Sequence, residues 1–494
     1  MRTVPGRTDR VVIVGAGLGG LAAALHLAGS GREVTVLERA SEPGGRAGVI
    51  RDGGYTFDTG PTVITMPSLI GDALAAVGED LDDWLDLRRL DPAYRARFAD
   101  GSMLDVHADV DAMAAAIGAL CGPRDADGYR RLVAYLQTLY EIEMPHFIAG
   151  NLDSPFALLR RPLLDLVRLG AFRRLAPKVG SFVRDERLRR LFTFQSMYAG
   201  LAPAQALAIY GVITYMDSVA GVYFPMGGVH AVPRALAGAA TKHGVTFRYD
   251  TGAARIEVRD GRATAVITES GDRIGADVVV VNADAPTAYR ELLAREPRRL
   301  RYSPSCVVLH AGVRGGDPDA HHTISFGAAW QSTFDEIIEQ GRLMSDPSFL
   351  LTTPTVTDPS LAPDGAHAHY ALFPAPNLDH RAPIDWTAEA PRYTERLLAT
   401  LQARGFSIDP EVRHVTTPAD WAAQGIAAGA PFAAAHRFGQ TGPFRMPTLD
   451  RRIENLVFCG SNAQPGVGVP MVLVSGRLAA ERVVGAHVGS ATIA

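Results

Sequence analysis

The first residues whose types and spacing could do chemistry are glycines near the N-terminus. The run Gly15-Ala-Gly17-Leu-Gly19-Gly20 follows four uncharged, β-branched residues, 11–14, and precedes an apolar segment, 21–27. In this G-x-G-x-x-G pattern the first glycine permits a tight turn, the second leaves room for a pyrophosphate, and the third lets a helix pack closely on a strand. Glu38 stands 18 positions after Gly20, where its carboxylate could accept hydrogen bonds from a ribose. These residues predict a dinucleotide site.

A second glycine turn, Gly44-Gly45-Arg46, follows this unit. A nicotinamide-dependent dehydrogenase would be expected to continue with another strand and helix, whereas a glycine turn lets the backbone approach a phosphate or the ribityl chain of a flavin. Arg46 would supply positive charge at that point. The turn therefore favours a flavin dinucleotide, and a surface hairpin is the alternative interpretation of its glycines.

A specific set of elements must hold these residues in place. The N-terminal residues form a βαβ pattern, with strands expected over 11–14 and 33–37 and a helix over 21–27. Near the other end of the chain, an apolar strand over 456–459 leads through a glycine-proline loop to a helix over 471–481. The N-terminus of that helix could stabilise negative charge on a reduced flavin. A helix that serves only for packing is the alternative.

The sequence pattern changes between these segments, which indicates a second domain. Residues 125–215 carry mostly helical periodicity, while 306–312 and 367–373 alternate like strands. We expect an α/β fold (α+β overall), in which a Rossmann-type FAD-binding domain carries an inserted, largely helical plus sheet, substrate domain. The expected division is 1–95, 222–295 and 445–494 for the discontinuous FAD-binding domain, and 96–221 and 296–444 for the substrate domain.

Composition excludes some classes of function. The chain has 494 residues and a net charge of −4, so no basic field is present to attract nucleic acid, and no nucleic-acid partner is expected. Three widely spaced cysteines argue against a disulfide framework and indicate a reducing, cytoplasmic compartment. The pairs His321-His322 and His367/His369 lack the spacing of a metal site, so we expect no bound metal.

Eight blocks of the sequence resemble the bacterial phytoene desaturase family, the FAD-dependent carotenoid desaturases of the flavin amine oxidase-like group. The blocks reach from one end of the chain almost to the other, at residues 11–20, 38–39, 43–46, 57–63, 224–228, 281–284, 455–460 and 465–470. Many flavoproteins share the glycine fingerprint. The blocks Gly-Pro-Thr-Val and Pro-Gly-Val-Gly-Val-Pro are more specific to this family.

The resemblance implies FAD as the cofactor and a set of residues that contact it. The implied cofactor-binding residues are Gly15, Ala16, Gly17, Gly19, Gly20, Glu38, Arg39, Gly45, Arg46, Gly60, Pro61, Thr62, Val63, Ala253, Asn282, Gly460, Ser461, Val469, Pro470 and Met471. The sequence departs from the family pattern at Ala463-Gln464, where Thr-His is common, and at Ser461-Asn462. These departures affect the contacts expected at the flavin edge.

The family resemblance also implies the reaction. Such an enzyme would convert 15-cis-phytoene, a lipophilic carotenoid precursor, by successive dehydrogenations toward lycopene, with hydride transfer to flavin N5 in an apolar channel. A quinone or dioxygen would then regenerate the flavin. Related desaturases that act on C30 or hydroxylated carotenoids, and polyene isomerases, remain alternatives within the family. An amine or protoporphyrinogen-type oxidase and a non-catalytic lipid carrier are the alternatives of another class.

Polar residues of the predicted substrate domain supply the candidates for a catalytic base. Arg161 is the candidate we retain, and Tyr140, His146 and Asp217 lie in the same predicted domain. Polar residues of a helical domain are more often surface groups, so none of them is assigned as the base.

Residues 158–178 carry six cations and one acid, interleaved with leucines, Val167 and Phe172. That combination is typical of a segment lying on anionic lipid, and a solvated helical face is the alternative. We therefore expect a cytoplasmic protein that associates peripherally with the inner face of the cell membrane.

Overall fold

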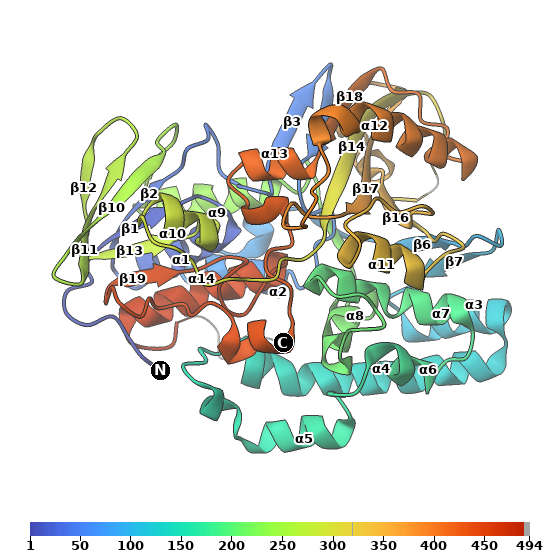
Figure 1. Cartoon of the computed structure of the whole chain (residues 1–494), viewed down its shortest axis with the longest axis horizontal. Helices are drawn as coiled ribbons and strands as arrows, with labels where there is room; N and C mark the ends of the chain where they lie inside the picture. Colours follow the sequence, from blue (N-terminus) through green and yellow to red (C-terminus); the bar gives the residue numbers. More distant parts are fainter. Residues whose placement is uncertain (319, 489–494) are drawn as a thin grey trace.

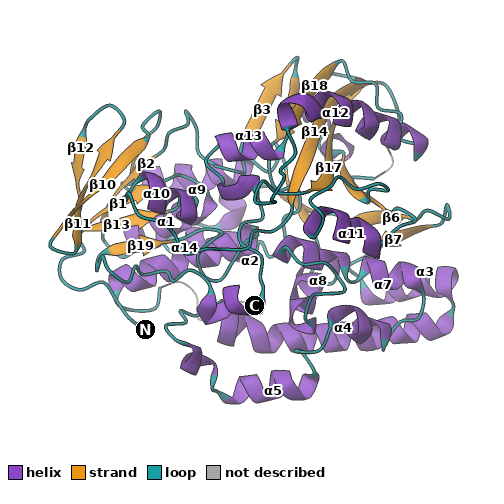
Figure 2. Ribbon diagram, viewed as in Figure 1, coloured by secondary structure: helices purple, strands orange, loops and turns teal. Residues whose placement is uncertain are grey.

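A computed structural model describes residues 1–318 and 320–488 of the chain. Its strands form two main sheets, a parallel one and a larger mixed one, with a group of helices beneath them (Figures 1 and 2). This arrangement confirms the α/β class and the helical plus sheet second region expected from the sequence. Residues 489–494, which the expected FAD-binding domain includes, lie outside the described residues.

The parallel sheet has five strands in the order β19-β13-β1-β2-β9. Val12 of β1 lies opposite Val279 of β13 on one side and Thr35 of β2 on the other. Because helices or a second sheet cover both faces, its central strands are β-branched and buried. The strands are β1 (Arg10–Val14), β2 (Glu33–Leu37), β9 (Thr246–Arg248), β13 (Val278–Val281) and β19 (Leu456–Phe458).

Helices cover one face of this sheet, and a small antiparallel sheet covers the other. Gly476 permits α14 to pack closely on α1, because a Cβ there would lie 2.3 Å from the backbone oxygen of Gly19. The covering helices are α1 (Leu18–Gly29), α2 (Ser68–Ala75), α9 (Ala231–Lys242) and α14 (Val469–Val484). Opposite them lie β10 (Ala253–Arg259), β11 (Arg262–Thr268), β12 (Arg273–Gly275) and α10 (Ala285–Glu291).

The mixed sheet has seven strands in the order β18-β14-β17-β16-β15-β6-β7. Its long central pair confirms the two strands expected from alternation. The strands are β6 (Tyr94–Arg97), β7 (Met103–Val106), β14 (Ser305–Arg314), β15 (His322–Ser325), β16 (Phe349–Thr352), β17 (Ala366–Ala375) and β18 (Val412–Thr416). Helices α11 (Gln331–Ile338), α12 (Trp386–Ala403) and α13 (Pro418–Ala423) pack around it. The expected domain boundary at residue 95 falls inside β6.

The helical region follows the periodicity seen in the sequence. It comprises α3 (Val110–Cys121), α4 (Pro123–Glu143), α5 (Arg161–Leu169), α6 (Leu175–Gly180), α7 (Glu186–Leu191) and α8 (Gly211–Ser218). Two small antiparallel sheets also occur: the hairpin β3 (Val49–Asp52) with β4 (Tyr55–Asp58), and the pair β5 (Leu87–Arg89) with β8 (Tyr223–Pro225), whose strands are distant in the chain. Two histidines of the pairs noted in the sequence bond to threonines at the end of β16. His322 bonds to Thr352 at 2.9 Å, and His369 bonds to Thr353, the residue after the strand, at 2.9 Å.

Candidate active site

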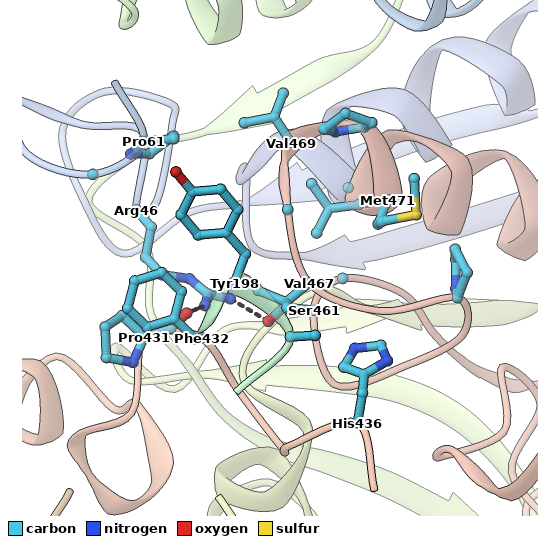
Figure 3. Close-up of a pocket in the computed structure, with 18 of the residues that line it drawn as sticks. Arg46, Pro61, Tyr198, Pro431, Phe432, His436, Ser461, Val467, Val469 and Met471 are labelled. Carbon is cyan, nitrogen blue, oxygen red and sulfur yellow. Dashed lines mark hydrogen bonds between the residues drawn. The ribbon is translucent and has the colours of Figure 1, made fainter. Parts of the chain in front are cut away.

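A cavity of about 1560 Å³ lies between the parallel sheet, the mixed sheet and the helical region. Ordinary small-molecule pockets measure roughly 300–1,000 Å³, so this cavity has room for two large ligands or for one cofactor with a substrate. One end is lined by the glycine turns at the carboxyl ends of β1 and β2, and the other by apolar side chains of the helical region and the mixed sheet. Figure 3 shows the region where the two ends meet.

The first glycine turn is open toward the cavity because its residues lack side chains. Gly15 has φ +100, a conformation that favours glycine, and a Cβ on Gly17 would lie 2.9 Å from Nδ2 of Asn282. A Cβ on Gly20 would lie 2.2 Å from the backbone oxygen of Gly15, so this glycine permits α1 to pack on β1. With Gly17 at its N-cap, α1 presents N–H groups that can bind a phosphate.

Glu38 lies directly after β2 and its carboxylate is held by two backbone amides. Ala16 donates to Oε2 at 2.7 Å and Ala40 donates to Oε1 at 2.9 Å. A carboxylate oxygen can accept more than one hydrogen bond, so Glu38 can still bind a ribose hydroxyl from the cavity side. This arrangement fixes the orientation of the side chain before a ligand arrives.

Arg46 connects the second glycine turn to two distant segments. Its guanidinium donates to the Pro431 carbonyl oxygen and to the Ser461 hydroxyl (Figure 3). Burial lowers the pKa of Arg46, and the nearby carboxylate of Asp284 acts in the opposite direction. Burial likewise raises the pKa of Asp284, which accepts a hydrogen bond from Asn462 Nδ2 at 2.7 Å. The two charges stabilise each other in a buried environment.

The segment 60–63 bridges the two ends of the cavity. A Cβ on Gly60 would lie 1.9 Å from the backbone oxygen of Arg46, so only glycine allows this segment to pack on the second turn. The Thr62 hydroxyl accepts a hydrogen bond from the Thr352 hydroxyl of β16 at 3.2 Å. The segment therefore ties the glycine turns to the mixed sheet.

The C-terminal segment closes the cavity from the opposite side. Helix α14 begins at Val469, inside the segment for which the sequence predicts a loop, and Gly468 at its N-cap has φ +112. Because Gly468 has no side chain, the first N–H groups of this 16-residue helix are available to an anionic group in the cavity. Val469 and Met471 lie at this helix N-terminus and line the cavity (Figure 3).

Most residues that the sequence assigns to cofactor binding line this one cavity. Two do not: Ala16, whose amide is bonded to Glu38, and Gly20, which faces β1. Arg161 is exposed at the start of α5 and is not among the residues that line the cavity. The lining residues are Gly15, Gly17, Gly19, Glu38, Arg39, Gly45, Arg46, Gly60, Pro61, Thr62, Val63, Ala253, Asn282, Gly460, Ser461, Val469, Pro470 and Met471.

Several cavity residues were not predicted from the sequence. His436 packs against the C-terminal loop, where a Cβ on Gly466 would lie 2.4 Å from its Cε1. Its Nε2 is buried with no hydrogen-bond partner among the described residues, and burial holds its pKa well below the usual range. Tyr198, Pro431 and Phe432 also project into this region (Figure 3). Tyr198 lies far in the chain from the consecutive Pro431 and Phe432, and the two segments share no local motif that could have identified them.

The residues around the two glycine turns and the start of α14 form a cradle whose chemistry fits FAD. It combines two uncapped helix N-termini, an oriented carboxylate at the end of β2 and glycines whose Cβ atoms would collide with the walls of the cavity. These features suit a dinucleotide with a pyrophosphate and a ribose. The apolar remainder of the cavity suits a second, uncharged ligand.

Comparison with known proteins gives matches along nearly the whole chain. A family model described as flavin containing amine oxidoreductase matches residues 18–484. A phytoene dehydrogenase of Streptomyces griseus is 55% identical over 99% of this chain and 98% of its own. A zeta-carotene-forming phytoene desaturase of Myxococcus xanthus is 38% identical over 96% and 93% of the two chains. A lycopene-forming phytoene desaturase of a Paracoccus species is 34% identical over 95% and 96%.

Among solved structures, a putrescine oxidase bound to putrescine has a similar fold. Its TM-score is 0.61 and its sequence identity is 17%, and the match covers 97% of this chain and all of the oxidase. At this identity the likeness concerns the fold alone.

Proposed function

Because the chain belongs to the flavin-containing amine oxidoreductases, and within them to the phytoene desaturases, we propose that it converts 15-cis-phytoene by successive FAD-dependent dehydrogenations toward lycopene. The observation that carries the proposal is the continuity of the cavity. One space joins the dinucleotide cradle to a long apolar chamber, so an uncharged polyene can lie against a bound flavin.

The chamber is suited to a hydrocarbon because its walls are largely apolar. Its lining includes side chains from the helical region and from the mixed sheet, among them Phe147, Leu207, Ile213, Phe326 and Phe334. A channel of this kind excludes water and holds the substrate by its shape, since a hydrocarbon has no polar groups to bind. A C30 carotenoid would fit the same chemistry and is an outcome of the assay below.

FAD, when bound, supplies the acceptor for the hydride that leaves the substrate. The protein contributes position and environment. The glycine turns and Glu38 would hold the adenosine and pyrophosphate end, while Arg46 and the N-terminus of α14 would stabilise negative charge at the flavin end. A quinone or dioxygen would complete the cycle, because each can diffuse into an apolar cavity without a binding site for a charged coenzyme.

Incubation of the FAD-loaded protein with liposomes that contain 15-cis-phytoene tests the function. We expect new conjugated double bonds, seen as polyene absorption bands that move stepwise to longer wavelength, with lycopene as the last product separated by chromatography. Protein from which FAD has been removed is the control and should form no new conjugated double bonds. Geometric isomers without new double bonds would favour a polyene isomerase, and conversion of only C30 or hydroxylated substrates would favour a related desaturase.

The segment around α5 supports attachment to a membrane surface. Helix α5 stands apart from the sheets at the edge of the molecule (Figure 1). Phe156 is 79% exposed, Leu159 71%, Leu164 56% and Val167 57%. Such a cluster of exposed apolar side chains beside cations is typical of an interfacial helix. Of the helices in the described ranges, none has the length and apolar character needed to cross a bilayer.

The inner side of the same helix faces the cavity. Leu163 and Leu166 line the cavity, and so does the exposed Phe438 from a separate segment. We propose that α5 lies on the lipid at the mouth of the chamber, where phytoene dissolved in the bilayer would enter. On this proposal the protein works as a peripheral protein at the inner face of the cell membrane.

Not every cation of 158–178 is available to lipid. Lys178 lies 4.4 Å from the ring centre of Tyr135, and burial lowers its pKa. The Arg174 guanidinium donates to the Gln205 carbonyl oxygen. The exposed cations left to face a membrane are therefore Arg160, Arg161, Arg168 and Arg173, of which Arg168 also pairs with Asp165 at 3.3 Å.

Substitution of Leu159, Leu164 and Val167 by serine should reduce membrane attachment. Each substitution removes apolar surface that would otherwise be buried in lipid. Full burial of one such side chain contributes roughly 1.5–3 kcal/mol to the free energy of binding. We expect co-sedimentation with anionic liposomes to fall at least about tenfold, while FAD binding is retained. Met103→Ser, at an exposed position of β7, is the matched control. Unchanged co-sedimentation of the triple variant would contradict the membrane role of α5.

A further inference from the structure

Asp217 lies in a buried position beside the cavity. It is on α8, is 2% exposed and lines the chamber. Its Oδ1 accepts a hydrogen bond from the hydroxyl of Tyr94, a residue of β6 that is 1% exposed. Its Oδ2 accepts from Gln195 Nε2 at 3.2 Å and from the Ser218 hydroxyl at 3.3 Å. The carboxylate is thus held by neutral donors.

The groups packed around Asp217 give it an unusual proton affinity. Burial raises its pKa to about 6, and the hydrogen bonds from Tyr94, Gln195 and Ser218 offset only part of that effect. His322 of β15 lies with its ring 5.5 Å from that of Tyr94, and burial holds the pKa of His322 well below the usual range, so it is neutral. At neutral pH Asp217 is therefore an ionised carboxylate that can gain a proton.

Tyr198 connects this carboxylate to the flavin end of the cavity. Its hydroxyl and that of Tyr94 influence each other's pKa, and the rings of both tyrosines contact Phe194. Its ring projects into the cavity in the region of Pro61 and Val469 (Figure 3). Tyr198 and Tyr94 therefore place two exchangeable hydroxyl protons between the cavity and Asp217, the second of them hydrogen-bonded to the carboxylate.

We propose that Tyr198, Tyr94 and Asp217 form the path that accepts the proton released in each desaturation step, with Asp217 as the final acceptor. The inference rests on the proposed function. A hydride leaves one substrate carbon for the bound flavin, and the adjacent carbon then loses a proton while the electron pair of that C–H bond forms the new double bond. The Tyr198 oxygen receives this proton while the Tyr198 hydroxyl proton passes to the Tyr94 oxygen. The Tyr94 hydroxyl proton in turn passes to the Asp217 carboxylate. One carboxylate becomes a carboxylic acid per double bond.

Two other buried groups of the chamber suit this role less well. Burial raises the pKa of Glu143 well above its usual range, and its Oε1 has no hydrogen-bond partner among the described residues, so nothing there stabilises an ionised carboxylate. His436 is hydrogen-bonded through Nδ1 to the Thr441 hydroxyl at 3.3 Å. Burial lowers its pKa well below the usual range, so its imidazole is a weak proton acceptor. Asp217 is ionised at neutral pH, lines the cavity and is hydrogen-bonded to Tyr94.

Infrared spectroscopy of the FAD-loaded protein tests the titration directly. We expect carboxylic acid C=O absorption to grow as the pH falls through about 6, from Asp217 and from Asp58, whose pKa burial also raises to about 6, and Asp217→Asn should remove the Asp217 contribution. In Tyr94→Phe the midpoint should move to higher pH, because the hydrogen bond from Tyr94 stabilises the ionised form. A purely structural aspartate that stays ionised throughout this range would overturn the inference.

Anaerobic flavin reduction by phytoene tests the role in the reaction. In the wild type the rate should rise with pH through about 6, because only the carboxylate can accept a proton. In Asp217→Asn we expect a rate at least about 10²-fold lower and independent of pH in this range, with Asp217→Glu restoring the pH dependence. Tyr198→Phe should be slowed similarly. Asp127→Asn, an exposed carboxylate of α4, is the control and should behave as the wild type.

The outcomes separate the two proposals. Wild-type flavin that phytoene fails to reduce at any pH would overturn the proposed function, and the relay with it. Normal reduction with the wild-type pH profile in Asp217→Asn would overturn the relay alone. If Asp217→Asn loses FAD or fails to fold, Tyr94→Phe decides, because it interrupts the path while Gln195 and Ser218 still hold the carboxylate.

Discussion

Replacing Gly17 with valine is expected to weaken FAD binding by at least about a thousandfold, equivalent to about 4 kcal/mol. A Cβ at this position would already lie 2.9 Å from Asn282 Nδ2, and the two further methyl groups would occupy the space that the pyrophosphate needs. Titration of the apoprotein with FAD, followed by flavin fluorescence, measures the effect.

Gly439→Val is the matched control for this substitution. A Cβ at Gly439 meets nothing within 4 Å, so valine there should leave the affinity for FAD unchanged. Circular dichroism of both variants establishes that the fold is retained. A Gly17→Val protein that folds and binds FAD as tightly as the wild type would show that the first glycine turn does not hold the pyrophosphate.

Replacing Arg46 with methionine is expected to lower the free energy of unfolding by about 3–5 kcal/mol, because the buried carboxylate of Asp284 loses its compensating charge. The pKa of Asp284 is already raised by burial, and Arg46 is the charge that opposes this shift. Without Arg46 the pKa should rise further, so protonation would relieve the buried charge. The loss of stability should therefore be larger at neutral pH than at mildly acidic pH, as measured by denaturant unfolding.

The double variant Arg46→Met/Asp284→Asn provides the control. Removing the charge of Asp284 should restore most of the stability lost in Arg46→Met, because no buried charge is then left unpaired. Equal instability of the single and double variants would contradict the account. It would indicate that the bonds from Arg46 to Pro431 and Ser461 carry the stability instead.

The sequence was sufficient to predict the parallel sheet and the glycine turns at its edge. Both depend on local requirements: a strand buried on two faces needs β-branched residues such as Val12 and Val279, and a close approach needs glycine at Gly17. Such requirements leave a readable pattern over a few residues. The start of α14 was predicted two residues late, since Val469 and Pro470 also belong to a glycine-proline run.

The rest of the site could not be read from local patterns, because it forms only when distant segments meet. Asp217 looked like one polar residue among several in a helical region, yet folding buries it against Tyr94, 123 positions away in the chain. His436 reaches the cavity because Gly466 leaves space for its ring. Arg161, the retained candidate for the base, has no such partners and is exposed on α5.

The central claim is that this chain uses bound FAD to oxidise a polyene inside the cavity, and anaerobic titration of the FAD-loaded protein with 15-cis-phytoene in liposomes tests it most directly. We predict that the oxidised flavin absorption disappears, with one flavin reduced for each new double bond found in the extracted product. Bound flavin that stays oxidised while the polyene is unchanged, or is only isomerised, would contradict the account.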